Sequence, residues 1–480
     1  MPWLDAALPA RMARVALVAP AEDLRDMLVL VASAGAAEID GADSGQEAEA
    51  ARRLSRSASS VGTAEPGATP ALCPAPPDLD ELERTGRYDL LSGEAQLQAY
   101  AAGAVRGPGC VALAAWVPAA RRKELVRRLA PLGCAVVPLP RPRISEPPTL
   151  LGGSARRRSL SPLVSTYGTV PYADISPAWL AWGSYVLMFG MMFGDAGHGL
   201  ILVGAAAALR AGWPRPLRRL RAAWPFVGGA GVMAVVFGIL YGEFFGPTGL
   251  IPAFWLVPLD HPLPLLAAAV GVGAALLAGS YALGTVNRFR EGGWPLAAYA
   301  PSGIAGTLLF LGGGLAAAGW YVHDAAALTG GAIAAVVALA LALAGFLAQA
   351  GGGGTGAVQA IVELFDFVVR LGSNVVSFAR LAAFGLTHAA LGLLVWEATW
   401  ALWHRGGIMI AVAVLVFAAG NALAFGLEAL VAAIQALRLE YYELFSRVFV
   451  TQGRPFRPWA LRIAADAPAP PGMDFLNTTA

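Results

Sequence analysis

Apolar residues fill most of the chain beyond the first 160 positions, in long runs that short polar segments interrupt. A helix needs about 20 predominantly apolar residues to cross a bilayer, and these runs approach or exceed that length. The pattern predicts eight membrane-spanning helices, at residues 178–194, 196–210, 222–246, 264–287, 294–318, 326–350, 357–403 and 407–449. The last two runs are so long that we expect their helices to tilt strongly or to project beyond the bilayer.

The first part of the chain has a different pattern. Residues 11–40 read as strand, helix and strand, and residues 108–140 repeat that order. Residues 41–107, between them, are predicted to be a flexible, low-complexity insert, so the two units would pack into one compact α/β unit. The expected organisation is a small cytosolic α/β domain at 1–165, an all-α polytopic membrane domain at 166–460 and a cytosolic tail at 461–480.

A polar stripe runs along the predicted helix at 357–403. At 100° per residue, eight side chains fall within an arc of about 100° and over about 35 Å of helix. They are Glu363, Asp366, Arg370, Ser373, Ser377, Arg380, Phe384 and His388. A cation in hydrocarbon costs several kcal/mol, so Arg380 must face protein, water or a carboxylate. Two interpretations follow: a structural ion pair between helices, or a functional site inside the membrane.

The last predicted span carries a second polar face. Its members recur near every seventh residue: Asn421, Glu428, Gln435, Tyr442 and Ser446. Arg438 lies beside this face, about 15 Å along the helix axis from Glu428. Glu440 and Glu443 are expected to form a solvated helix end.

Three further polar residues lie near predicted span ends. Asp195 and His198 follow a glycine in a tight reversal between the first two spans, where we expect them to cap the turn. Glu243 is expected to be a satisfied structural carboxylate rather than an ion ligand.

Composition and charge agree with a membrane protein. The chain is 57% hydrophobic and 14% charged, whereas soluble proteins carry about 25% charged residues. The net charge of +2 argues against a nucleic-acid partner. Basic loops such as 215–221 and 287–291 fall on one side of the predicted spans, which places this side and both termini in the cytoplasm. Three cysteines without CxxC spacing, and no evident signal peptide, favour a reducing compartment for the α/β domain.

Motifs for bound nucleotides and metals are absent from the sequence. Lys123 is the only lysine and lies outside any GxxxxGK[ST] loop, so another subunit would bind ATP if ATP is involved. The five histidines are scattered and form no HExxH motif. We therefore expect no cofactor and no metal.

Four segments resemble one known family in the same order. NVVSFARLAAFGLTHAAL at 374–391 is similar to the penultimate membrane helix of the a subunit of V-type rotary ATPases, called subunit I in prokaryotic complexes. FGMMFGDAGHGL at 189–200, FGILYGEFFG at 237–246 and ALRLEYYELFSRVFVTQGRPFRPW at 436–459 resemble further segments of that 116 kDa subunit family. The family usually carries a long helical hairpin between two α/β lobes, for which this chain has too few residues.

The resemblance implies a membrane stator subunit of a V-type ATPase or ATP synthase, in a prokaryotic cell membrane. Its implied partners are a proteolipid ring, peripheral stalk subunits, a central-stalk d-type subunit and the lipid bilayer. Arg380, assisted by Arg438, would face the ion-carrying carboxylate of the ring. Two half-channels for H⁺ or Na⁺ would be lined by Glu428, His388, Asp366, Glu363, Gln435 and Ser377. The basic helix at 121–129 would bind acidic stalk helices.

Two other classes of function stay open from the sequence. One is an ATP-independent ion channel or exchanger that keeps the same membrane fold. The other is an assembly scaffold, which the shortened α/β domain would favour if it cannot bind stalks.

Overall fold

The computed structural model describes residues 9–40, 49–60, 69–141, 146–150, 168–213, 215–351, 353–448 and 453–464. The chain divides into two compact units. The α/β unit lies within Pro9–Gly152 and the part from Gly453 onward, and the membrane unit lies within Gly153–Gln452.

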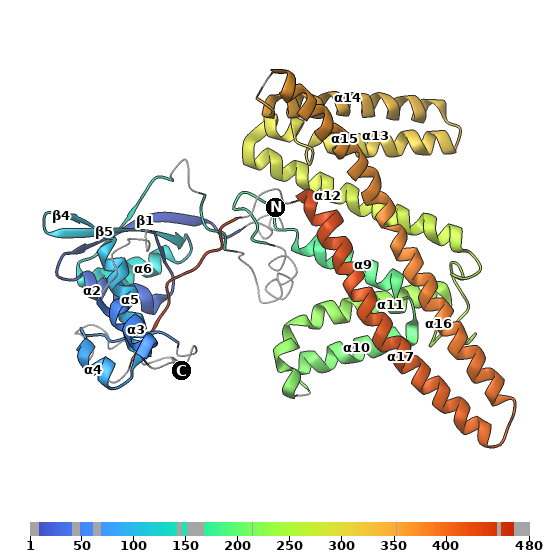
Figure 1. Ribbon diagram of the computed structural model, residues 1–480, viewed down its shortest axis with the longest axis horizontal. Coiled ribbons are helices and arrows are strands. Elements are labelled where there is room, and N and C mark those ends of the chain that lie inside the picture. Colours follow the sequence, from blue (N-terminus) through green and yellow to red (C-terminus); the bar gives the residue numbers. More distant parts are fainter. Residues whose placement is uncertain are drawn as a thin grey trace. The chain divides into compact units, whose positions relative to one another are not determined.

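An antiparallel sheet is the centre of the α/β unit, drawn in blue to cyan in Figure 1. Its central strands β1 (Met12–Pro20) and β5 (Cys110–Pro118) pair along their whole length, with Leu17 opposite Leu113. Strand β2 (Glu38–Ile39) pairs with β5 on one side, and β6 (Ala135–Pro138) pairs with β1 on the other. The sheet order is therefore β2-β5-β1-β6, and β4 (Val105–Gly107) pairs with the start of β5.

A helix follows each central strand, so two βαβ units interleave in one sheet. Helix α2 (Leu24–Ala34) follows β1, and α6 (Arg122–Leu129), extended by the 3₁₀ turn η1 (Ala130–Leu132), follows β5. Both units contribute to one hydrophobic core, which confirms the prediction that they pack together.

Much of the predicted insert is folded, so the prediction of a flexible segment across 41–107 is wrong for these folded parts. The structure contains α3 (Glu49–Ser60), β3 (Ala71–Leu72), α4 (Leu79–Arg84) and α5 (Tyr88–Ala102). The apolar residues of this segment are spaced so that they share one helix face. Helix α5 buries Leu90, Leu91 and Leu97 on that face. Residues 41–48 and 61–68 lie outside the described residues.

The C-terminal segment completes the α/β unit. Strand β7 (Arg462–Ile463) pairs in parallel with β3, and the buried Trp459 packs on Tyr100 with ring centroids 4.8 Å apart. The predicted tail at 461–480 therefore begins inside a folded domain.

The membrane unit is helical. Its first half contains α9 (Ala178–Met192), α10 (Ala196–Ala211), η2 (Arg215–Ala223), α11 (Trp224–Tyr241) and α12 (Pro262–Tyr299). Its second half contains α13 (Ile304–Tyr321), α14 (Ala325–Gln349), α15 (Gly353–Ser377), α16 (Ala379–Trp403) and α17 (Ile408–Leu439), then the π-helical turn η3 (Glu440–Phe445) and α18 (Ser446–Val448).

Six helical stretches among the described residues are long and apolar enough to cross a membrane. The apolar helices α9 and α10, predicted as the first two spans, are shorter than these. One predicted boundary is wrong: residues 294–299 belong to the end of α12, after a kink at Gly293, and the next helix begins at Ile304. Gly293 has φ of 71°, a left-handed conformation that favours glycine.

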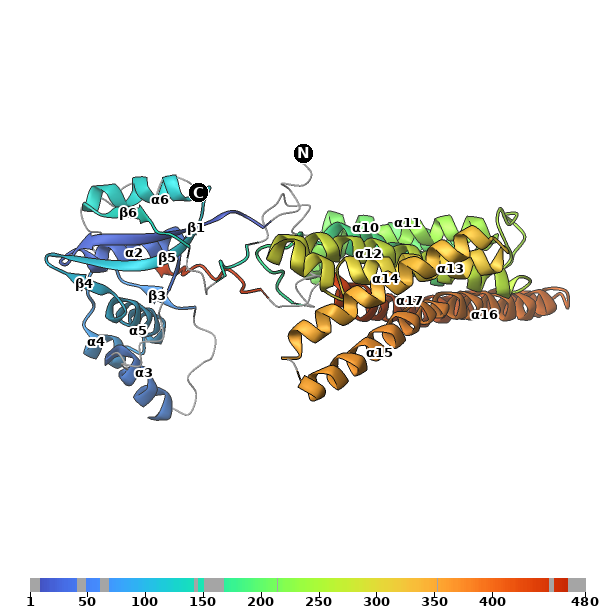
Figure 2. The same ribbon diagram turned by 90° about the horizontal axis from the view of Figure 1, so that it is seen from above.

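The predicted helix at 357–403 is interrupted at Phe378. The amide of Phe378 donates to Val375 O, and Leu381 donates to Phe378 O, so i to i−3 bonds replace the α-helical pattern here. Beyond this break the two halves have different neighbours: α15 packs on α14, whereas α16 runs beside α17 (Figures 1 and 2).

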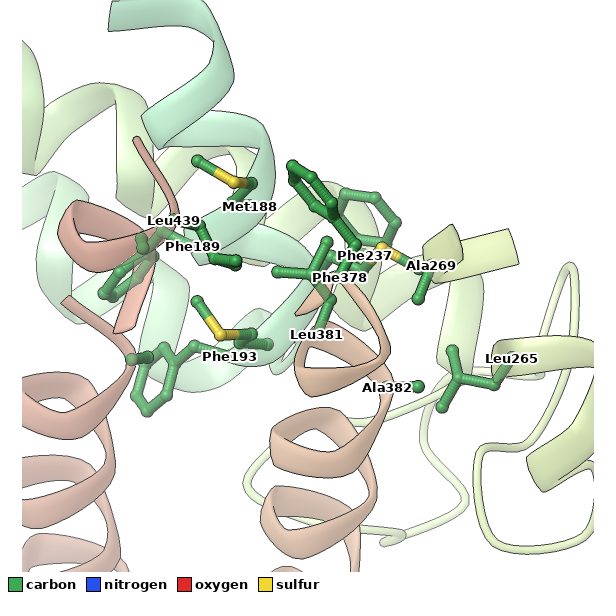
Figure 3. Packing of buried hydrophobic residues seen from close by; sticks show 14 of the residues in the cluster. Met188, Phe189, Phe193, Phe237, Leu265, Ala269, Phe378, Leu381, Ala382 and Leu439 are labelled. Atoms are coloured by element: carbon green, nitrogen blue, oxygen red, sulfur yellow. The ribbon is translucent and has the colours of Figure 1, made fainter. Parts of the chain in front are cut away.

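Phe378 is held at this break by the core of the membrane unit. Its side chain is fully buried in a cluster to which α9, α11, α12, α16 and α17 contribute (Figure 3). A Cβ atom added to Gly273 of α12 would lie 2.1 Å from Cγ of Phe378, so the ring occupies space that only glycine leaves open. This close approach fixes the start of α16.

Candidate functional site

Arg380 lies in the first turn of α16, directly after the break. Its side chain is half-buried, and its Nη1 is buried without a hydrogen-bond partner. Within the described part of the chain, no carboxylate oxygen lies within 4.0 Å of this guanidinium. The structural ion pair that the sequence left open is therefore not formed among these residues.

The nearest charges to Arg380 come from the end of the last long helix. Arg438 is exposed on α17, and it and Glu443 of η3 both act electrostatically on Arg380. With the Asn374 amide oriented so that its nitrogen faces acceptors, it donates to Glu443 Oε2 over 2.8 Å. In the same orientation, Arg447 donates to the Asn374 oxygen over 2.5 Å. Glu443 is thus joined to α15, and the prediction of a solvated helix end is wrong for it.

An exposed apolar stripe on α17 leads to Arg438. It consists of side chains spaced at i, i+4, i+7 and i+11, which share one helix face: Leu423, Leu427, Leu430 and Ile434. Only 6% of the most apolar window of this span is buried within the unit, against 28–33% in the other five. This face is therefore free to contact lipid or an apolar partner.

Glu428 and His388 form a buried pair on another side of α17. The Glu428 carboxylate contacts Nδ1 of His388 through Oε2, and both side chains are less than one tenth exposed. The sequence placed these residues on two separate polar faces, and the packing of α16 on α17 brings the faces together.

Two residues of the first hairpin adjoin this pair. Asp195 caps α10 as predicted: its Oδ1 accepts from the amide of His198 and its Oδ2 from that of Gly246, both over 2.8 Å. The His198 ring lies 5.8 Å from the His388 ring between centroids, and its Nδ1 is 3.6 Å from Asp195 Oδ1. Sequence reasoning treated this hairpin as structural. The one signal that could have linked it to His388 is that both histidines occur in motifs of the same family.

Glu243 lies close to the same group. Its side chain is buried, and the expectation that it is a satisfied structural carboxylate stays a prediction. The field of Asp195, Glu428 and His388 acts on it.

The remaining predicted site residues are not brought to this group. Asp366 is exposed on α15 and pairs with Arg370 over 2.7 Å, and Glu363 accepts a hydrogen bond from Gln359. Ser377 donates to the carbonyl of Ser373. Gln435 lies on α17 with its Oε1 buried and without a partner. The single stripe expected from the sequence is split because the helix breaks at Phe378.

Glu440 is fully buried, so the prediction of a solvated helix end is wrong for it too. Its Oε2 accepts a hydrogen bond from Ser184 of α9 over 2.5 Å, while Oε1 has no partner. The contact joins the π-helical turn to α9, and it arises because packing against α9 removes this turn from solvent.

A buried charged group precedes α9. Asp174 is fully buried, and the Arg288 guanidinium lies 4.0 Å from it while pairing with Glu291 over 2.5 Å. Burial is the largest cause that raises the pKa of Asp174, to about 8, and the neighbouring Glu291 adds to it. Asn287 accepts from the amide of Ile175, so this segment is bound firmly to α12.

These features define a polytopic membrane protein with a small α/β domain and with unpaired or buried charges on its last helices. Residues 108–247 match the model of the V-type ATPase 116 kDa subunit family.

The curated relatives reported below are all named subunit I of an A-type or V-type ATP synthase. The chain is 26% identical to A-type ATP synthase subunit I of Thermococcus kodakarensis over 369 residues, which are 72% of this chain and 54% of that protein. It is 26% identical to A-type ATP synthase subunit I of Pyrococcus horikoshii over 418 residues, 80% of this chain and 61% of that protein. A stretch of 179 residues is 31% identical to V-type ATP synthase subunit I 2 of Treponema pallidum, 32% of this chain and 38% of that protein. The matches thus span less than two thirds of each relative.

Proposed function

We propose that this chain is the membrane stator subunit of a V-type ATPase or ATP synthase, and that Arg380 faces the carboxylate of a rotating proteolipid ring. One observation carries the proposal: Arg380 has a buried nitrogen without a partner and no carboxylate of the described chain within ion-pair distance. An unpaired cation among membrane helices is too costly to leave uncompensated, so its counter-ion comes from another subunit.

The chemistry of the two groups explains the coupling. A ring carboxylate must be neutral while it crosses lipid, because a bare charge there is prohibitive. Arg380 stabilises the ionised form where ions are exchanged, and it blocks direct leakage because a guanidinium does not deprotonate. Arg438 extends the positive field along the exposed face of α17.

Ions reach the ring through two half-channels. The buried pair Glu428 and His388 lines one of them, since it supplies titratable groups inside the helices. Glu363, Asp366, Ser377 and Gln435 are the candidates for the other. In this arrangement eight helices cross the membrane, including α9 and α10, and both termini are cytoplasmic. The further partners are peripheral stalk subunits, a central-stalk d-type subunit and lipid.

Cysteine cross-linking tests the ring-facing surface. In a chain whose three native cysteines are replaced, Leu427→Cys and Ile434→Cys place thiols on the exposed stripe of α17. Both should cross-link to the proteolipid in membranes that contain the whole complex. Ile333→Cys, equally exposed but on α14, is the matched control and should not.

The same cross-linking experiment distinguishes the stator from the two alternative classes of function. If neither α17 thiol reaches a proteolipid and none copurifies with the chain, the stator proposal fails, and an ATP-independent channel or an assembly scaffold becomes the better explanation.

A further inference from the structure

Asp195, His198 and His388 bring three potential metal ligands to one point. One ligand atom from each residue lies within 4.8 Å of the others, and the three residues are 0%, 3% and 5% exposed. Around a tetrahedral zinc ion, ligand atoms lie about 3.4 Å apart, so small side-chain rotations suffice to close the set.

His198 points to a missing ligand independently. Both its ring nitrogens are buried, and neither makes a hydrogen bond of ordinary geometry to the described residues, although the backbone of Asn421 lies close enough to act on the ring. The ring is surrounded by the aromatic side chains of Phe193, Phe245 and Phe425, with centroids 5.2–5.6 Å away. Leaving a buried polar group without a partner is unfavourable, and a bound ion would offset that cost.

The other two ligands are held in place by their neighbours. The Glu428 carboxylate contacts Nδ1 of His388, which leaves Nε2 for an ion; histidine ligands in metal sites commonly have such a carboxylate on the second nitrogen. Asp195 is fixed by two backbone amides, and each of its oxygens keeps a second lone pair.

We propose that Asp195, His198 and His388 bind a divalent transition-metal ion of the zinc type, with Glu428 as the positioning residue. Two imidazoles and one carboxylate suit Zn²⁺ or Co²⁺, whereas Mg²⁺ and Ca²⁺ prefer sets of oxygen ligands. Three protein ligands leave a fourth position open for water.

The bound ion also has a consequence for ion flow, which rests on the proposed function. Zn²⁺ on His388 fixes this ring and adds positive charge beside Glu428, at one of the proposed half-channels. Micromolar Zn²⁺ should therefore slow ion uptake into vesicles, and His198→Gln should relieve the inhibition.

Direct binding tests the site without any need for ion flow. Purified full chain without a polyhistidine tag is titrated in detergent with Zn²⁺ by calorimetry and with Co²⁺ by visible absorption. We expect one ion per chain and a tetrahedral Co²⁺ spectrum. His198→Gln should lower the affinity by at least about tenfold, and Glu428→Gln by about 10–100-fold. His404→Gln, which changes an exposed histidine, should bind like the wild type.

A conservative variant tests whether misfolding explains the lower metal affinity of His198→Gln. His198→Cys keeps a zinc ligand and should bind Zn²⁺ more tightly than His198→Gln. The site is overturned if the wild type binds no stoichiometric ion, if His198→Gln binds as tightly as the wild type, or if His404→Gln loses as much affinity. Zinc binding without any ion transport would leave the site standing and count against the proposed function alone.

Discussion

At the scale of single residues, the membrane unit contains charged side chains of two kinds. Some contact a side chain of opposite charge, and others do not. Glu428 contacts His388 through one carboxylate oxygen while its Oε1 stays buried without a partner, and Arg380 finds no carboxylate in the described chain. Removing one partner of a buried ion pair costs about 3–5 kcal/mol, because it leaves the other charge buried and uncompensated.

Replacement of Arg380 should abolish coupled transport. Arg380→Ala is expected to reduce ATP-driven ion uptake by the reconstituted complex to background, because in the proposed mechanism nothing then stabilises the ionised ring carboxylate. Arg380→Lys should lower uptake by at least about tenfold, since an ammonium lacks the planar fork and loses its charge more readily when buried. Membrane insertion should be unchanged in both. Near-normal uptake by either variant would remove Arg380 from the mechanism.

Glu428 should matter more than the other buried carboxyl of the same helical segment. Glu428→Gln removes the carboxylate partner of His388 and should slow transport by roughly tenfold or more. In Glu440→Gln the amide oxygen can still accept from Ser184, so transport should change little. Initial rates of ion uptake compare the two, and equal effects would show that the Glu428 pair is not on the ion path.

Asp174 should make stability depend on pH. Its pKa is raised from 3.8 to about 8, so the folded protein holds a proton that the unfolded chain releases between these values. The free energy of unfolding should therefore fall by up to about 1.4 kcal/mol per pH unit as pH rises through this window. Above about pH 8 the stabilisation from the proton on Asp174 is lost, and the free energy of unfolding should stop changing for this reason. Thermal unfolding in detergent from about pH 5 to about pH 9 measures this. Asp174→Asn should flatten the curve, whereas Asp260→Asn, at an exposed position, should keep it.

At the scale of elements, the break at Phe378 decides which side chains face α17. A continuous helix would have kept the eight polar residues in one stripe. Instead, the buried Phe378 ring against Gly273 ends α15 and starts α16 in a new direction. Asp366 stays exposed while His388 is buried.

Gly273 should be sensitive to a single added methyl group. In Gly273→Ala the new Cβ overlaps the Phe378 ring, and overpacking of this kind costs about 1–3 kcal/mol. Gly271→Ala is the matched control, because a Cβ there meets nothing within 4 Å on the same helix. The melting temperature in detergent should drop for the first variant only. Partial recovery in Gly273→Ala with Phe378→Leu would assign the loss to this contact, and equal melting temperatures for the two glycine variants would contradict it.

At the scale of the whole molecule, the α/β unit is assembled from distant parts of the chain. Strands β1 and β5 pair across the folded insert, and β7 brings the C-terminal segment back to β3. Helix α6 anchors Leu125 and Leu129 in this core and leaves its basic side chains exposed.

In the proposed complex, the exposed face of α6 should bind peripheral stalk subunits. Arg121→Glu with Arg122→Glu should weaken binding of peripheral stalk subunits by roughly tenfold at low salt and make it less salt-sensitive, because a cationic surface attracts acidic partners. Arg84→Glu with Arg106→Glu changes charge equally at exposed positions of the same unit and should have little effect. The measurement is copurification of the stalk subunits across a series of salt concentrations. A similar loss of binding in both double variants would indicate a general charge effect.

The sequence by itself determined the division into an α/β unit and a helical membrane unit. Strand and helix periodicities were strong enough to predict β1, α2, β5, α6 and β6, and apolar length predicted the long membrane helices. It missed α5, because a helix with few charges and many small residues has the composition of a flexible segment.

Tertiary structure alone decided the site. Periodicity places residues on a face of one helix, but it cannot say where a helix breaks or which face meets another helix. The break at Phe378 depends on a glycine of α12, and the group of Asp195, His198, His388 and Glu428 forms because α10 meets the consecutive helices α16 and α17, which are distant from it in the chain. The burial of Glu440 likewise follows from α9, because a carboxylate near a helix end becomes buried only when another element covers it.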